Sequence, residues 1–236
     1  ILDDSKITRI NLYDKAGNGL VESETSMDKS GYPVDISLSP NGELLAISYL
    51  YLDSGLMKTS IAFHNFGEVG QNLSSDRFVS GYDYHGTIVP FIHFMNSGTA
   101  FAVADDRIMF FSGTEKPLSA AEKLLGDKIQ SVFYNDQYVG LVFLNTEGDG
   151  KYRLDIYDAG GNLISSKGFD MEYTNITFQK DEFFICSDTE YSIYNIHGTE
   201  RFNGQFDEIV YLFVPQEKSN RFLIMTQNAM RLMEMK

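Results

Sequence analysis

The sequence predicts an all-β fold, a β-propeller of four-stranded antiparallel blades, on three observations. Short segments of alternating apolar residues recur along the chain, and one strand-turn pattern repeats every ~40–50 residues. Aromatic residues are frequent, with 14 tyrosines and 18 phenylalanines among 236 residues, and such side chains suit a pleated, half-buried surface. A single propeller domain over residues 1–236 is therefore predicted.

The repeat consists of a strand, a central aromatic residue, a turn-forming Asp or Asn, and a nearby glycine. Its clearest copies are INLYDKAGN at 10–18, LDIYDAGGN at 154–162 and YSIYNIHGT at 191–199, with looser copies at 61–67 and 108–113. The central aromatic residues are separated by 50, 47, 47 and 37 positions: Tyr13, Phe63, Phe110, Tyr157 and Tyr194. A degenerate copy at 230–234 follows, and the count favours about five blades in this chain.

The individual strands are predicted in order from these copies. The opening strand, 6–13, resembles the third strand of a blade that lacks its first two strands. The next blade takes 34–38, 44–51, 58–66 and 78–84. Three strands are predicted in each later blade: 88–94, 100–104 and 107–112, then 129–134, 138–145 and 152–157, then 175–179, 183–187 and 191–194, and finally 209–214, 221–227 and 230–235.

Turn chemistry supports the hairpin between the first and second strands of a blade. Asn41 and Gly42 both tolerate a positive φ, which suits a tight hairpin turn. Turn-prone residues stand at the same place in other repeats: Asn96–Gly98, Asn135–Asp136 and Lys180–Asp181. These positions predict the inner hairpin of each blade.

One segment, 116–126, departs from strand character. Ser119 and Glu122 have the spacing of a capping box, apolar residues follow at helical intervals, and Gly126 closes the segment. A short helix between blades, packed over a blade edge, is predicted here.

Composition limits the partners. The formal net charge of −14 argues against nucleic acid, because phosphate binding depends on Lys and Arg, and against direct contact with an anionic membrane surface. Solubility is the favoured explanation of the acidity. The single cysteine, Cys186, lies in a predicted buried strand and is interpreted as a packed thiol.

No catalytic residue, metal site or cofactor is predicted. The four histidines, at 64, 85, 93 and 197, lack the spacing of a zinc motif, and His64 and His197 are interpreted as solvated turn residues. Asp105–Asp106 is read as a turn-forming pair in preference to a catalytic dyad. Segment 147–150, EGDG, is read as a hairpin loop, with a calcium contact as the less favoured alternative.

Ligand binding is predicted at Tyr82, Tyr84 and His85, within SGYDYHG at 80–86. A glycine-bounded, aromatic loop between blades offers stacking faces and hydroxyl groups to a sugar or peptide. The alternative is ordinary packing of the tyrosines over a blade edge, since aromatic side chains are most often buried.

A family resemblance adds to these predictions. SPNG followed by LLAI, at 39–47, resembles a hairpin common in WD40-like and YVTN-like propellers. The order of NLYDKAG at 11–17, DISLSPNGELLAI at 35–47 and DIYDAGGN at 155–162 resembles a family of uncharacterised, membrane-anchored bacterial proteins with a domain of unknown function. The absence of tryptophan departs from true WD40 repeats and from quinoprotein propellers, which disfavours quinone-dependent dehydrogenase chemistry.

The resemblance implies an outward-facing propeller that is anchored by an N-terminal helix preceding this chain, and it suggests that further blades precede Ile1. The predicted function is a non-enzymatic, extracytoplasmic binding or scaffold module that recognises protein or a cell-surface glycan through loops at one propeller face. The alternative is a glycan-acting hydrolase or lyase with carboxylates at the channel mouth. An enzyme needs several carboxylates or a histidine within hydrogen-bond reach in one pocket, which separates the two hypotheses.

Overall fold

The computed structural model describes residues 2–3, 7–26, 31–53, 55–71, 77–146, 148–216 and 221–234. Within these ranges the regular secondary structure consists of β-strands and one helix, the short α2 (Glu68–Gln71). No helix in the described part has the length and hydropathy needed to cross a membrane. The chain divides into two compact units, residues 1–126 (unit 1) and 127–236 (unit 2), while the single domain over 1–236 stays a prediction.

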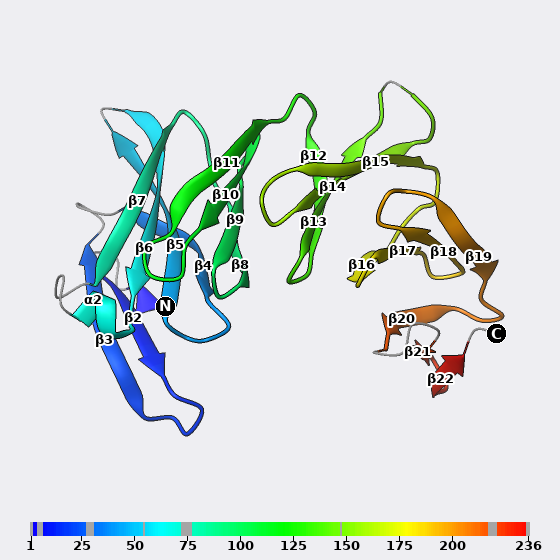
Figure 1. Cartoon of the computed structure of the whole chain (residues 1–236), viewed down its shortest axis with the longest axis horizontal. Helices are drawn as coiled ribbons and strands as arrows, with labels where there is room; N and C mark the ends of the chain where they lie inside the picture. Colours follow the sequence, from blue (N-terminus) through cyan, green and yellow to red (C-terminus); the bar gives the residue numbers. More distant parts are fainter. Residues whose placement is uncertain are drawn as a thin grey trace. The chain divides into compact units, whose positions relative to one another are not determined.

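Unit 1 holds three antiparallel sheets whose strands follow one another in the chain, and β4 lies against β8 (Figure 1). The three-stranded sheet consists of β1 (Leu2–Asp3), β2 (Ile7–Tyr13) and β3 (Gly19–Ser26). The second sheet consists of β4 (Tyr32–Leu38), β5 (Leu44–Asp53), β6 (Leu56–Asn65) and β7 (Phe78–His85). The third consists of β8 (Phe91–Asn96), β9 (Thr99–Val103), β10 (Arg107–Ser112) and β11 (Leu118–Leu124).

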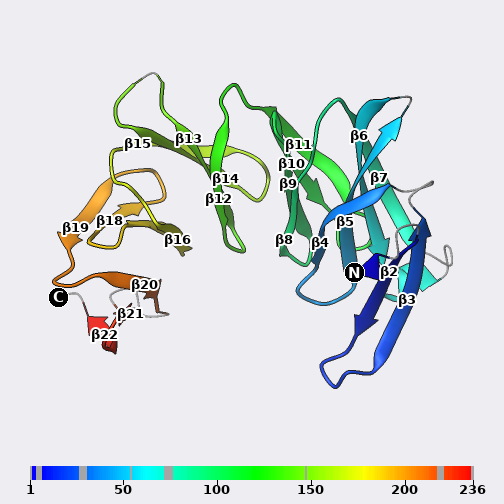
Figure 2. The same cartoon turned by 180° about the vertical axis from the view of Figure 1, so that it is seen from behind.

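Unit 2 continues the same pattern, and its first strands β12, β16 and β20 lie next to one another in that order (Figure 2). One sheet consists of β12 (Ile129–Tyr134), β13 (Tyr138–Leu144), β14 (Tyr152–Asp158) and β15 (Leu163–Phe169). The next consists of β16 (Asn175–Gln179), β17 (Glu182–Cys186), β18 (Glu190–Asn195) and β19 (Glu200–Gln205). The last is three-stranded, with β20 (Val210–Pro215), β21 (Arg221–Thr226) and β22 (Met230–Glu234).

The predicted repeat coincides with a recurring β-bulge. In the four-stranded sheets the pairing of the third strand with the fourth shifts register, and in the first sheet the pairing of β2 with β3 does so. Each shift includes one of the five aromatic markers: Tyr13, Phe63, Phe110, Tyr157 and Tyr194. A bulge places one extra residue in a strand and increases its twist. The described residues form four complete four-stranded sheets and two three-stranded ones, which agrees with the expectation of about five blades.

The core lies between neighbouring sheets. In unit 1, Phe63 of β6 contacts Phe94 of β8 and Phe111 of β10, with ring centroids 6.1 and 5.1 Å apart. In unit 2, the ring of Tyr138 in β13 lies 6.2 Å from that of Phe178 in β16 of the next sheet. These side chains come from the alternate strand positions that face the next sheet, as the predicted apolar alternation requires.

The helix predicted at 116–126 is wrong, because this segment forms strand β11. It pairs with β10 from Arg107–Leu124 to Ser112–Leu118. The apolar ends Leu118 and Leu124 are 56% and 75% exposed, so a helix here would have little apolar face to bury. Hydrogen bonding along the β10 edge therefore outweighs local helix propensity.

Other sequence expectations have mixed outcomes. Gly42 takes a positive φ of 78° and donates its amide to Ser39, whereas Asn41 keeps a negative φ. The opening strand was expected to lack both preceding strands of its blade. One preceding strand is present, since β1 pairs with β2. Cys186 is buried as predicted.

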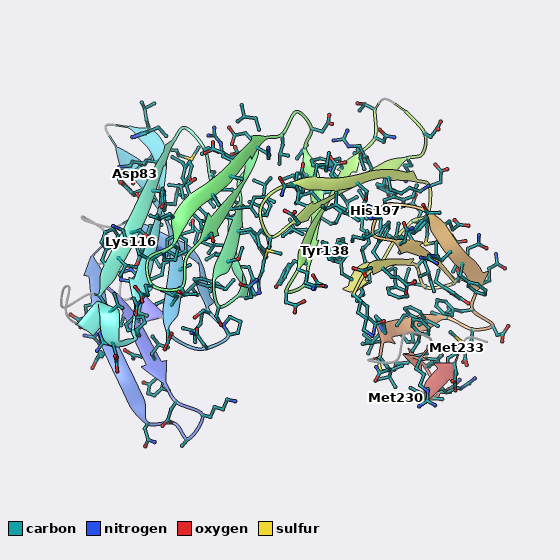
Figure 3. All side chains as sticks on the ribbon, viewed as in Figure 1. Asp83, Lys116, Tyr138, His197, Met230 and Met233 are labelled. Atoms are coloured by element: carbon teal, nitrogen blue, oxygen red, sulfur yellow. The ribbon has the colours of Figure 1, made fainter. Side chains whose placement is uncertain are left out.

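The two histidines interpreted as turn residues differ. His197 is exposed in the turn between β18 and β19, as predicted (Figure 3). His64 is buried near the end of β6, with its ring 6.0 Å from that of Phe78. The interpretation of His64 as a solvated residue is wrong, because the strand continues past it to Asn65.

Candidate functional site

The predicted ligand residues Tyr82, Tyr84 and His85 lie within strand β7, not in a loop. Alternation along the strand sends Tyr82 and Tyr84 to one face, where they pack against the core of unit 1, and His85 to the other. The structure therefore keeps the two tyrosines together and separates them from the histidine. The glycines that suggested a loop are accommodated by the strand and by the positive φ of Gly86.

Tyr82 is held by the connection between β10 and β11. Its hydroxyl donates to the carbonyl of Pro117 at 3.1 Å and accepts from the amide of Ser119 at 2.9 Å. Ser80 donates to the same Pro117 carbonyl at 2.6 Å. In Figure 3 the neighbouring Lys116 lies beside the strand that carries Asp83. The hydroxyl of Tyr82 is thus used in holding two sheets together.

Tyr84 is closed off by Arg107, the first residue of β10. The guanidinium lies 6.0 Å from the Tyr84 ring centroid and forms ion pairs with Asp106 at 2.7 Å and Glu122 at 2.6 Å. Burial raises the pKa of the Tyr84 hydroxyl. Hydrogen bonding to Arg107 lowers the pKa of Asp106.

The Asp105–Asp106 pair occupies the turn between β9 and β10, as predicted. Thr87 donates its hydroxyl to Asp105 and also to Asp106, the latter at 2.9 Å. Arg107 donates to both carboxylate oxygens of Asp106, and the amide of Ile88 lies 3.3 Å from Asp105 Oδ1. These bonds hold the β9–β10 turn against the connection that follows β7, and the ion pair with Arg107 favours the carboxylate form of Asp106 over proton donation.

A cleft of about 860 Å³ lies in unit 2, between the sheet β12–β15 and the sheet β16–β19. One wall is the end of β15, with Lys167 and Phe169, and the other includes Tyr194 of β18. The connection 170–174 and the turn 187–190 complete the lining. This volume falls in the range of small-molecule and peptide sites, and we take the cleft as the candidate functional site.

The cleft corresponds, residue by residue, to the closed junction of unit 1. The β-bulges align Ser80 of β7 with Ser165 of β15, because each pairs with the residue before the bulge. The turns after β9 and β17 share the same closing bond, Ala104 N to Arg107 O at 2.8 Å and Ser187 N to Glu190 O at 2.9 Å. The corresponding pairs are Tyr82 and Lys167, Tyr84 and Phe169, Phe111 and Tyr194, Asp105 and Asp188, Asp106 and Thr189, and Arg107 and Glu190.

The charge at the centre of the junction is therefore reversed. Where unit 1 places the guanidinium of Arg107, unit 2 places the carboxylate of Glu190. Within the described part of the chain, the carboxylates of Asp188 and Glu190 have no hydrogen-bond or ion-pair partner. The side chain in the Tyr82 position, Lys167, places its Nζ 5.3 Å from the Tyr194 ring centroid.

The remaining carboxylates of the cleft already have partners. Glu172 forms an ion pair with Lys151 and accepts from the Tyr152 hydroxyl at 2.8 Å. Hydrogen bonding to Lys151 lowers the pKa of Glu172, although both groups are largely exposed. Asp170 accepts the amide of Lys151 at 2.9 Å. Asp188 and Glu190 are thus the two carboxylates left to contact a ligand.

Metal binding finds no support in the described residues, which contain no group of three His, Cys, Asp or Glu side chains placed to hold an ion. His93 is half-buried beside Phe91 and Phe101, and burial lowers its pKa. In the EGDG segment, Glu147 lies outside the described residues. Residues Asp188 and Glu190 were missed by sequence reasoning, although alignment of the repeats at the turns 104–107 and 187–190 would have revealed them.

Comparison with solved structures supports the propeller fold. The WD40 domain of Pan2 from Neurospora crassa has a TM-score of 0.53 and 6% identity, over 92% of this chain and 66% of that one. The dihydro-heme d1 dehydrogenase NirN in complex with DHE has a TM-score of 0.54 and 9% identity, over 92% of this chain and 46% of that one. This chain thus spans about half to two thirds of those structures. The predicted β-propeller of antiparallel four-stranded blades is confirmed. At identities this low, the activity of a similar structure cannot be assigned to this chain.

Sequence comparisons give one family. The match is to the family described as "Family of unknown function (DUF5711)", over residues 1–235. A comparison with curated proteins gives no match.

Proposed function

The chain belongs to the DUF5711 family of unknown function, and on that premise we propose that it is a non-enzymatic binding module whose partner is a protein. The observation that carries this proposal is the cleft between β15 and β18, about 860 Å³ in volume, with aromatic walls and two unpartnered carboxylates on its rim. A propeller offers rigid sheets on which such a site keeps its shape. Recognition through loops at one propeller face remains a separate prediction.

The alternative, a glycan-acting hydrolase or lyase, is not favoured. A general acid at neutral pH needs a raised carboxyl pKa. Among the described carboxyl groups whose pKa is clearly shifted, the shift is downward in each case: Asp14, Asp83, Asp106, Asp158 and Glu172. These groups are stabilised as carboxylates, which suits ion pairing and not proton donation.

Placement outside the cytoplasm, through an anchor that precedes Ile1, is part of the same proposal. It is supported by the sequence resemblance to membrane-anchored propeller proteins. Protease treatment of intact and lysed cells, expressing the full reading frame with an epitope tag on this domain, tests it. Digestion in intact cells is expected, and protection until lysis would contradict the placement.

The binding function is tested with arrays of short peptides and of cell-surface glycans. Binding to peptides is expected, and Thr189→Trp should abolish it, because this exposed residue lines the cleft and a large ring there occupies its volume. Thr199→Trp is the matched control, since Thr199 is exposed on the neighbouring turn and does not line the cleft. Binding of glycans alone, or peptide binding that Thr189→Trp leaves unchanged, would contradict the proposal.

A further inference from the structure

The inference concerns the chemistry that the cleft of unit 2 recognises, and it rests on the proposed binding function. In unit 1, the equivalent junction is completed by a cation. The guanidinium of Arg107 lies against Tyr84 and bonds to Asp106 and Glu122. A cation over an aromatic face and between carboxylates is stabilised by both contacts.

Unit 2 lacks the cation, and the carboxylates at this place differ from those of unit 1. Thr189 and Asn203 stand where Asp106 and Glu122 pair with Arg107. Phe169 replaces Tyr84 on the wall, Asp188 keeps the carboxylate of Asp105, and Glu190 adds a carboxylate at the position of Arg107. The junction is hollow at this place, where the cleft is lined by all three residues. Space and uncompensated negative charge therefore occur together beside an aromatic wall, in which the buried ring of Phe169 packs against Tyr152 at 5.3 Å and Tyr173 at 5.7 Å.

The cleft already stabilises one ammonium group of its own. The Nζ of Lys167 lies over the outer part of the wall, 5.3 Å from the Tyr194 ring centroid. The Tyr194 ring is also stacked on Phe183 at 5.0 Å and 15°, which fixes the ring. Among the described residues that line the cleft, Lys167 is the one basic residue, against four acidic ones, Asp170, Glu172, Asp188 and Glu190.

We propose that the cleft binds an arginine or lysine side chain presented by a basic segment of a protein partner. The partner's cation takes the place that Arg107 has in unit 1, between the aromatic wall at Tyr173 and the carboxylates of Asp188 and Glu190. Arginine is preferred over lysine, because its planar guanidinium both stacks on a ring and bonds to carboxylates in two directions. The net charge of −14 steers such a segment toward the protein.

The test uses three fluorescent peptides of one length, with alternating Gly and either Arg, Gln or Glu, and fluorescence anisotropy at low salt. The wild-type protein is expected to bind the Arg peptide at least about tenfold more tightly than the Gln peptide, because charge-assisted contacts distinguish them. Glu190→Gln and Asp188→Asn should each weaken Arg-peptide binding by about tenfold. Glu190→Arg, which restores the residue found in unit 1, should abolish it.

The control removes two negative charges outside the cleft. Glu115→Gln with Asp207→Asn changes two exposed carboxylates that do not line it, and Arg-peptide binding should stay within about twofold of wild type. Circular dichroism of every variant confirms that the strands are retained. An equal loss of Arg-peptide affinity in the control and in Glu190→Gln would show that the peptide is attracted generally to an acidic surface, and it would overturn the inference.

Two further outcomes separate the inference from the function on which it rests. If the Gln or Glu peptide binds as tightly as the Arg peptide, and Thr189→Trp blocks it, the cleft is a peptide site and the cationic preference is wrong. If no peptide of any charge binds, the proposed protein-binding function fails together with the inference.

Discussion

Two junctions between neighbouring sheets share one backbone plan and differ in what fills them. In unit 1, β7 and the connection that follows it are held by Arg107, by the hydroxyl bonds of Thr87 to the Asp105–Asp106 turn, and by the bonds of Tyr82 to the β10–β11 connection. In unit 2, the turn 187–190 repeats the closing hydrogen bond of 104–107, yet a cleft of about 860 Å³ stands beside it. Side chains at equivalent positions therefore decide whether such a junction is closed or open.

The comparison also separates the aromatic residues singled out in the sequence from the open cleft. The tyrosines that attracted attention in the sequence, Tyr82 and Tyr84, serve the closed junction. The open junction has a lysine and a phenylalanine in their places, Lys167 and Phe169. The charged residue of the turn distinguishes the two junctions, Arg107 in unit 1 and Glu190 in unit 2. In the sequence such a residue is easily interpreted as part of a solvated loop.

The largest expected effect comes from emptying the closed junction. Phe111 is fully buried, and its ring lies 5.1 Å from those of both Phe63 and Tyr82. Phe111→Ala should lower the free energy of unfolding by about 3–5 kcal/mol, through lost burial and the cavity left behind. Urea denaturation measures it, and a loss below about 1 kcal/mol would mean that the junction is not tightly packed.

Replacing the charged residue of each turn by a neutral one should lower the free energy of unfolding by different amounts. Arg107→Met removes ion pairs to Asp106 and Glu122 and should cost about 1–2 kcal/mol. The matched change Glu190→Gln removes no described partner and should stay within about 0.5 kcal/mol of wild type. Equal losses in both variants, by urea denaturation, would contradict the distinction between a closed and an open junction.

Acidification should weaken the closed junction of unit 1. The pKa of Asp106 is lowered by Arg107, so its stabilising contribution is present above the ordinary carboxyl pKa and is lost as pH falls through the lower, folded-state value. The difference in Tm between wild type and Asp106→Asn should therefore shrink between about pH 7 and about pH 2.5. A difference that grows on acidification would contradict this assignment.

The smallest expected effect is at Cys186, which lies behind the cleft. Its carbonyl accepts the amide of Thr174 at 2.7 Å, and burial raises the pKa of its thiol to about 12. The native protein should hardly react with a thiol reagent, and reaction should go to completion in denaturant. Fast reaction of the native protein would show that the cleft is deeper than the structure describes.

How much the sequence could predict depends on the kind of signal. Buried third strands carry aromatic markers, so their period and the propeller fold could be predicted. Edge strands such as β11, β15 and β19 have polar, exposed positions and are specified by pairing with a neighbour, so one was taken for a helix and two were not predicted. The cleft was not predicted, because Asp188 and Glu190 stand out only when the turn 187–190 is aligned with the turn that contains Asp105 and Arg107.

Hydrogen exchange with and without the Arg peptide tests the central claim, that the two junctions differ in openness and in ligand binding. The account predicts slower exchange on binding in 167–174 and 187–190, and no change in 104–107, whose junction is already filled by Arg107. Slower exchange in 104–107, or unchanged exchange in both turns at saturating peptide, would contradict it.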